Sequence, residues 1–330
     1  MIRSSKYQLN KVLLVCLFLL PIMGFSDLKT HDDYEKAALD SFNLGKYKKV
    51  INLCDKGMDI RGNSVSLINL KGQSQFLLRQ YNESQLTFKK LLVLANKTKD
   101  PMTYALYYNN MGEIHRVQGQ LDKALGLYKK ALALNRGGKN LLGEAINYHN
   151  MGKVFRTQGN LKKAINYFQQ SIELKVKEKD RFGAALSYNE LGLVYESKKT
   201  YKKALTYYKE SEKLLKTTRS IYYWGLVMGN IGRIHFLRKN YDEALRELQK
   251  ALGIAERIED FRGLSTRCIH LSMVYIKLNN YVMALKYFTR SIETRRDKLK
   301  EPPSKKDIIF LNKLKILAQK RQNVSNSPIK

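Results

Sequence analysis

The stretch YNNMGEIHRVQGQLDKALGLYKKA, residues 108–131, returns 40 residues later as YHNMGKVFRTQGNLKKAINYFQQS, residues 148–171. A third copy, YNELGLVYESKKTYKKALTYYKES, occupies residues 188–211, and two more divergent copies follow at 228–251 and 268–291. The best-matched copies share an aromatic residue, a large residue followed by glycine, and then an alanine, a second aromatic residue and a small residue. A fixed period of this length is typical of a solenoid, in which similar units stack in a row.

Each copy contains two segments with the pattern of a helix. In the first segment, apolar or small residues fall at offsets 0, 3, 4 and 7, which places them on one helical face. Gly119 marks the turn before the second segment. Glycine inside a helix costs roughly 1 kcal/mol relative to alanine. The recurrence of glycine at the Gly112 position therefore predicts that close helix packing at Gly112 and Ala124 offsets this cost.

This pattern resembles the tetratricopeptide repeat, a paired-helix unit with a usual period of 34 residues. The six additional residues per copy fall between the second helix of one unit and the first helix of the next. Such lengthened units are similar to the repeats of Pins/LGN-type spindle adaptors, kinesin light chains and bacterial peptide-sensing regulators. The resemblance implies an all-α fold, a right-handed superhelical solenoid of antiparallel helix pairs in which the first helices line a concave binding face.

The repeats define the expected domain organisation. Weaker matches to the register extend upstream of the clear copies, so we expect one solenoid of about seven helix pairs within residues 27–298. After a Pro-Pro pair, apolar residues recur on one helical face, and residues 299–322 are predicted to form a helix that caps the exposed end of the stack. Residues 323–330 are predicted to form a flexible tail.

Residues 1–26 have the pattern of a secretory signal peptide. Arg3, Lys6 and Lys11 precede an apolar run at residues 12–25. This run of 14 residues is shorter than the stretch of about 20 that spans a membrane. Gly24 and Ser26 are small, which suits cleavage before Asp27. We therefore expect export to a periplasm or to the extracellular space. The alternative is a membrane anchor formed by an uncleaved N-terminal segment.

Two cysteines, Cys54 and Cys268, remain after such a cleavage and lie in the first and seventh units. Each unit of a solenoid contacts only its neighbours. The two residues therefore cannot bring their Cα atoms within the roughly 7 Å that a disulfide requires. Both are expected to be buried thiols that pack as small apolar residues.

The chain has a formal net charge of +31, and loss of the three basic residues in 1–26 would leave +28. A charge of this size attracts acidic protein segments and anionic envelope surfaces. The alternative interpretation is that the many lysines reflect overall composition and serve solubility. The sequence contains no nucleic-acid recognition motif, so we expect no nucleic-acid partner.

The concave face implied by the resemblance would carry polar residues of the first helices. Asparagine recurs two residues before the glycine in three copies, which resembles the asparagine ladder of long-period repeats. An amide both donates and accepts hydrogen bonds, so such a row suits an extended peptide, and neighbouring basic residues would favour carboxylates. Glu190 interrupts the asparagines, and the alternative is a solvated helix face. The predicted peptide- or protein-binding residues are Asn109, Asn110, Glu113, Arg116, His149, Asn150, Lys153, Arg156, Asn189, Asn230 and Arg233.

No catalytic pattern accompanies the repeats. The sequence lacks the ligand spacing of a metal site, a phosphate-binding loop, a dinucleotide fingerprint and a nucleophile elbow. We therefore expect no enzymatic activity, no cofactor and no metal. The leading interpretation is an exported scaffold that binds a peptide or protein partner, an acidic one included, in an adaptor or assembly role. The alternatives are a sensor half that acts through a separate output protein, and a basic protein that binds polyanions of the cell envelope.

Overall fold

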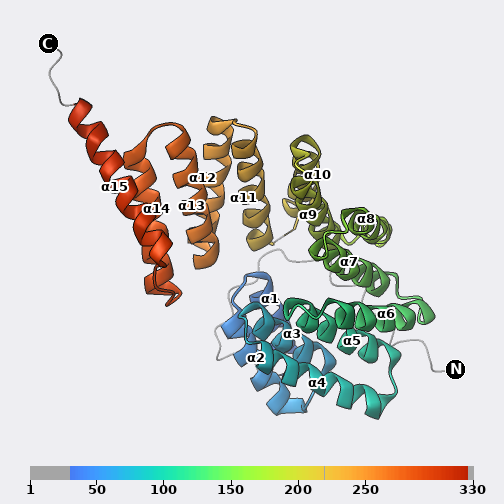
Figure 1. Cartoon of the computed structure of the whole chain (residues 1–330). Coiled ribbons are helices and arrows are strands. Elements are labelled where there is room, and N and C mark those ends of the chain that lie inside the picture. Colours follow the sequence, from blue (N-terminus) through green and yellow to red (C-terminus); the bar gives the residue numbers. More distant parts are fainter. Residues whose placement is uncertain (1–29, 219, 326–330) are drawn as a thin grey trace.

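The computed structural model describes residues 30–218 and 220–325, and these residues form α-helices and no β-strand (Figure 1). Consecutive helices pair, α1 with α2 through α13 with α14, and the seven pairs stack in chain order before a final helix, α15. The predicted all-α solenoid of antiparallel helix pairs is confirmed. The helices are α1 (His31–Asn43), α2 (Tyr47–Arg61), α3 (Val65–Leu77), α4 (Tyr81–Thr98), α5 (Pro101–Val117), α6 (Leu121–Gly137), α7 (Leu141–Thr157), α8 (Leu161–Lys177), α9 (Arg181–Ser197), α10 (Tyr201–Leu215), α11 (Ile221–Leu237), α12 (Tyr241–Arg257), α13 (Phe261–Lys277), α14 (Tyr281–Lys298) and α15 (Lys305–Ser325).

Side-chain caps fix where most of the first helices begin. Asp100, Asn140, Asp180 and Asp260 accept hydrogen bonds from backbone amides in the first turns of α5, α7, α9 and α13. Such caps satisfy amide groups that have no partner within the helix. These helices and α11 begin at a common spacing of 40 residues. Each first helix therefore presents the same register positions to its neighbours.

Most helices are followed by a residue with left-handed backbone conformation, which lets the chain reverse direction. Gly119 and Gly159 have this conformation between the two helices of their units, and glycine adopts positive φ without a steric cost. Lysine stands at the corresponding places in the next two units, as Lys199 and Lys239. Nine non-glycine residues have positive φ in the described part of the chain, and six of them are lysines. The turn geometry is therefore kept while the residue changes.

The two helices of a unit approach closely where a glycine faces an aromatic ring. A Cβ atom added to Gly112 would lie 2.5 Å from the ring of Tyr128, and one added to Gly192 would lie 2.4 Å from that of Tyr208. Both tyrosines and the adjacent Ala124 are fully buried. Burying a large apolar side chain contributes about 1.5–3 kcal/mol, which exceeds the glycine cost of roughly 1 kcal/mol. The predicted close packing at Gly112 is observed, and the residue in contact is Tyr128.

Cys54 on α2 and Cys268 on α13 are buried free thiols, as predicted. Burial raises the pKa of Cys54 to about 12 and that of Cys268 to about 11. A thiol with a raised pKa carries little thiolate at neutral pH, and the thiolate is the reactive form. Both residues therefore serve as small members of the core.

Helix α15 closes the C-terminal end of the stack. Its residues Leu314 and Ala318 are buried. Phe310 meets Phe288 of α14 edge to face, with ring centroids 4.7 Å apart. These contacts cover an apolar face of the last pair, which would otherwise be exposed to water.

The two predicted terminal segments lie largely beyond the described residues. The predicted signal peptide, residues 1–26, is outside them, and α15 continues to Ser325, which is within the segment 323–330 predicted as a tail. Among the helices of residues 30–325, none combines the length and the apolar composition needed to cross a bilayer.

Candidate functional site

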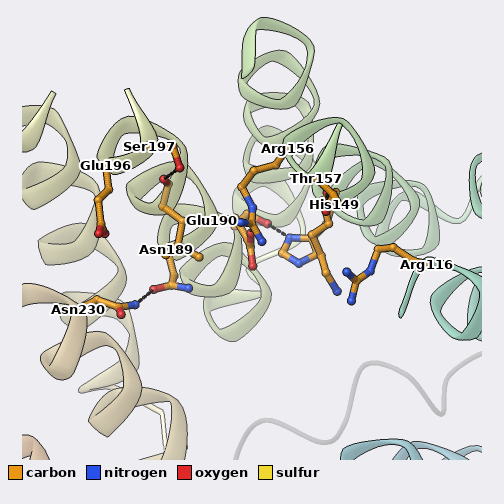
Figure 2. Close-up of polar contacts among 12 residues, drawn as sticks. Arg116, His149, Arg156, Thr157, Asn189, Glu190, Glu196, Ser197 and Asn230 are labelled. Carbon is orange, nitrogen blue, oxygen red and sulfur yellow. Dashed lines mark hydrogen bonds and ion pairs between the residues drawn. The ribbon is translucent and has the colours of Figure 1, made fainter. Parts of the chain in front are cut away.

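The eleven predicted binding residues lie on four first helices, α5, α7, α9 and α11, and we call them the polar row. Figure 2 shows part of it, with Arg116, His149, Arg156, Asn189 and Asn230 on neighbouring helices. The structure joins members of the polar row to one another, or to residues beside them, across the unit boundaries. Their partners determine what the row can do.

Amide side chains connect neighbouring first helices. In each pair the Nδ2 group of one asparagine donates to the Oδ1 atom of an asparagine in the preceding unit. Because the pairs are buried or half-buried, they bridge the helices with little competition from water. Four such pairs occur, Asn110 to Asn69 at 2.8 Å, Asn147 to Asn109 at 3.3 Å, Asn150 to Asn109 at 2.8 Å and Asn230 to Asn189 at 2.9 Å (Figure 2).

Glu113 is the centre of a compact charge cluster between α5 and α7. The Arg116 guanidinium donates to both carboxylate oxygens at 2.9 and 2.8 Å, and Lys153 Nζ donates at 2.6 Å. The hydroxyl of Tyr128 donates to the same carboxylate at 2.8 Å. Burial alone would raise the pKa of Glu113, but Lys153 and Arg116 outweigh it and hold the pKa well below its usual range. The carboxylate therefore stays ionised and joins the two units.

The next two unit boundaries are joined by single ion pairs. Arg156 Nε donates to Glu190 at 3.0 Å, so the residue that interrupts the asparagines joins α7 to α9 by charge (Figure 2). Arg233 pairs with Glu196, which also accepts a hydrogen bond from the Tyr208 hydroxyl at 2.9 Å. A ligand carboxylate would therefore compete with a carboxylate of the chain at every basic residue of the polar row. These basic residues are Arg116, Lys153, Arg156 and Arg233.

His149 takes a structural position within the polar row. Its Nδ1 atom lies 2.9 Å from the Ser187 hydroxyl. Burial, followed by the charge of Lys175, lowers the pKa of His149 well below its usual value, so the ring is neutral. Lys175 Nζ donates to Ser187 at 3.1 Å and to the Gly183 carbonyl at 3.2 Å, and burial lowers its pKa to about 8. This part of the row belongs to the boundary between α7, α8 and α9.

Sequence reasoning missed one buried cation near this face, Arg267 on α13. Its side chain is 9% exposed. The position corresponds to Asn147 and Ser187 in earlier units, and Gly225 and Gly229 lie opposite it on α11. The sequence signal is an arginine where α7, α9 and α11 carry the smaller Asn147, Ser187 and Val227, combined with glycines where α5, α7 and α9 carry side chains.

Two adjoining cavities lie elsewhere, between α10, α11 and α12. Their volumes are about 490 and 350 Å³, and both are lined by Glu212, Lys216 and Lys250. Trp224 and Met228 belong to the first cavity only. The lining of these cavities includes no residue of the polar row.

Solved structures share this arrangement of helices at low sequence identity. BtubC (BKLC) from P. vanneervenii is 18% identical with a TM-score of 0.58, and the match covers 69% of this chain and 94% of that chain. The APC/C hetero-tetramer Cut9-Hcn1 is 18% identical with a TM-score of 0.61, covering 86% of this chain and 49% of that chain. A Rap protein complexed with competence and sporulation factor is 14% identical with a TM-score of 0.58, covering 80% and 76%. At these identities the similarity is one of fold.

Family models match the repeats themselves. One tetratricopeptide repeat model matches residues 103–175 and 225–297, and a second matches residues 149–215. No curated protein sequence matches the chain. Because the matched segments together cover more than half of the chain and coincide with the stacked helix pairs, the chain belongs to the tetratricopeptide repeat family.

Proposed function

We propose that this chain is an exported, non-catalytic scaffold that binds a protein or peptide partner along the polar row. The observation that carries the proposal is the pairing of polar side chains across successive unit boundaries, such as Asn109 with Asn150 and Asn189 with Asn230. These pairs hold the first helices in a fixed relation before a partner arrives. A surface that is ordered in advance loses less conformational entropy on binding.

The chemistry of the row indicates the kind of segment that it would bind. Glu113, Arg156 and Arg233 are 19%, 30% and 28% exposed while they remain in their ion pairs. They can therefore contact a partner without giving up their internal partners. The side-chain amides of the row both donate and accept hydrogen bonds, which suits the backbone of an extended polar segment. Because the exposed charges are balanced, we expect the row to contribute specificity more than charge attraction.

Two further observations support parts of the proposal. A Rap protein of similar fold is complexed with competence and sporulation factor, which is consistent with the binding of a factor by such a solenoid. The signal-peptide pattern of residues 1–26 supports export. If the secreted protein begins at Asp27, N-terminal sequencing will show it. An intact N-terminus in the membrane fraction would instead support an uncleaved anchor.

The test is affinity capture from the extracytoplasmic fraction of the source cells, with the protein expressed from its whole gene. We expect a discrete partner that resists high salt and is lost when Asn150→Ala is combined with Arg156→Ala. The matched control combines Lys129→Ala with Lys130→Ala, because both lysines are exposed on α6, away from the row. Equal capture by the two double variants would exclude the polar row as the binding surface.

A second candidate function rests on the net charge of +31, which favours binding to polyanions of the envelope. Attraction of this kind weakens steeply with salt because mobile ions screen exposed charges. Recovery of polyanions alone, lost at high salt and unaffected by the row variants, would favour this function over the scaffold. A partner that itself carries an enzymatic or regulatory output domain would favour the sensor-half alternative.

A further inference from the structure

The boundary between α11 and α13 is built differently from the boundaries before it. On α5, α7 and α9, the position equivalent to residue 229 carries Asn109, His149 and Asn189. On α11 it is Gly229, and one turn earlier Gly225 stands where the other first helices carry alanine. Gly225 therefore lacks a side chain against Ile254 of α12, and Gly229 lacks one on the face of α11 that meets α13.

The side chain of Arg267 fills the space that Gly229 leaves. Its Nη2 group donates to the Gly225 carbonyl oxygen at 3.3 Å. A Cβ atom added to Gly229 would lie 2.4 Å from Nε and 2.7 Å from Cζ of Arg267. The guanidinium therefore occupies the place that the side chain of residue 229 would take. Arg267 thus comes from α13 and brings a cation to the position of the polar row on α11.

This guanidinium has no acidic partner among the residues that the structure describes. The Arg267 side chain is only 9% exposed, and its Nε group has no hydrogen-bond acceptor. The acid that influences its pKa, Asp260, caps the N-terminus of α13 by accepting a hydrogen bond from the Gly263 amide at 2.9 Å. Burying a charge without a counter-charge costs several kcal/mol. An arrangement of this kind is explained if a ligand supplies the missing acceptor.

A second nitrogen without a partner lies nearby. Nδ1 of His270 is buried and makes no hydrogen bond within residues 30–325. Burial, and then the charges of Arg233 and Arg267, lower the pKa of His270 to about 4, so the ring is neutral at pH 7. Arg233 is balanced by Glu196. The site therefore holds one uncompensated positive charge, that of Arg267, and a neutral imidazole that can take the tautomer with a proton on Nδ1.

We propose that Arg267 and His270 form an anchoring site for one carboxylate of the bound partner, at the C-terminal end of the polar row. A carboxylate is planar and carries a single charge, which matches the fork of one guanidinium and its single excess charge. A phosphate dianion would leave a second negative charge without a partner. The inference rests on the proposed scaffold function and adds where an acidic group of the partner binds. The carboxylate can belong to an acidic side chain or to a chain terminus.

The first test measures carboxylate binding directly, without the natural partner. The probes are N-acetylglutamate methylamide for an acidic side chain, N-acetylglycine for a chain terminus, and inorganic phosphate, at constant ionic strength. The readout is the pKa of His270 from its imidazole NMR signals. A bound anion stabilises the imidazolium, so the pKa should rise from about 4 with either carboxylate. The carboxylate that gives the larger rise identifies the source.

The variants separate a specific site from general charge attraction. In Arg267→Gln the response of His270 should disappear, whereas in Arg246→Gln, which removes an exposed arginine of α12, it should persist. The proposal would be overturned if the pKa of His270 rose as much in Arg267→Gln as in the wild-type protein. Tighter binding of phosphate than of either carboxylate would also overturn it. If Arg267→Gln does not fold, Arg267→Lys keeps the charge without the guanidinium fork and should weaken the response.

The second test uses the partner recovered by affinity capture. Removing one member of a buried ion pair costs about 2–5 kcal/mol, so we expect Arg267→Gln to lower partner affinity about thirtyfold or more. Unchanged affinity would overturn the anchor and leave the scaffold function intact. Conversely, if partner affinity is unchanged in the Asn150 and Arg156 variants but falls in Arg267→Gln, the polar row is excluded as the binding surface and the anchoring site is retained.

Discussion

The boundary between α5 and α7 and the boundary between α11 and α13 join equivalent helices of the same repeat, yet their polar contacts differ. At the first, Glu113 binds Lys153, and Asn109 accepts a hydrogen bond from Asn150. At the second, the one side-chain hydrogen bond in the described residues runs from Arg267 to a backbone carbonyl. The repeat therefore allows two uses of one polar face. Where the chain supplies both partners, the face joins units, and where it supplies one, the face is available to a ligand.

The largest expected effect concerns the boundary between α5 and α7, which Glu113 joins. Replacing Glu113 by Gln leaves Arg116 and Lys153 without their counter-charge, and both are largely buried, at 17% and 18% exposure. We expect the free energy of unfolding to fall by about 3 kcal/mol, measured by urea denaturation with circular dichroism. Asp297→Asn is the control because its ion pair with Arg296 is exposed, and its effect on stability should be far smaller. Equal losses in the two variants would mean that Glu113 does not join the units.

The second prediction concerns the boundary between α11 and α13. In Gly229→Ala the new Cβ atom would meet the Arg267 side chain, so we expect a loss of about 1–3 kcal/mol. Gly126→Ala on α6 should have the opposite sign, a gain of up to about 1 kcal/mol, because nothing lies within 4 Å of the added atom. In an Arg267→Ala background the cost of Gly229→Ala should shrink. An unchanged cost in that background would show that the two residues do not compete for one space.

The third prediction is that acid weakens the two boundaries in different pH ranges. The pKa of His270 is about 4 in the folded chain, below its ordinary value near 6.5. The unfolded chain therefore binds more protons between these values, and stability should fall by on the order of 1–3 kcal/mol from pH 6.5 to pH 4. The pKa of Glu113 is also lowered, so its contribution is present above the unfolded value near 4.3 and is lost below it. In His270→Gln, urea titrations should show a smaller loss above pH 4 and an unchanged loss below it.

The smallest effect should come from the amide pairs. Asn150→Ala removes one hydrogen bond to Asn109, and a neutral hydrogen bond contributes about 1 kcal/mol. Asn230→Ala should cost at least as much, because it removes the pair with Asn189 and also the hydrogen bond that Asn230 Oδ1 accepts from Arg233 at 3.3 Å. Asn166→Ala on the exposed face of α8 is the control and should be neutral or slightly stabilising. If Asn150→Ala lowers the free energy of unfolding no more than the control does, the amide pairs do not stabilise the stack.

The sequence predicted the fold because the repeat encodes it locally. The prediction of close helix packing at Gly112 required only helical periodicity and the small size of glycine, and the structure places the ring of Tyr128 against Gly112. The polar row was predicted as a set of positions, while its internal pairing was not. Pairing depends on the distance between neighbouring first helices, which a single repeat does not specify.

Arg267 was missed for a related reason. Its role depends on the absence of a side chain at Gly229 and on the backbone carbonyl of Gly225, which lie about 40 residues earlier in the sequence and on the neighbouring first helix. Pattern analysis gives weight to residues that recur, and Arg267 stands at a position where the repeat is broken. The predicted signal peptide, residues 1–26, remains a prediction.

The left-handed turn residues show where this solenoid could be made more resistant to heat. Lys139, Lys199 and Lys239 occupy backbone conformations that glycine adopts without strain. A side chain in that region costs on the order of 1 kcal/mol. The turns therefore offer adjustable positions outside the polar row. Replacing these lysines by glycine should give a more heat-resistant solenoid with the polar row unaltered.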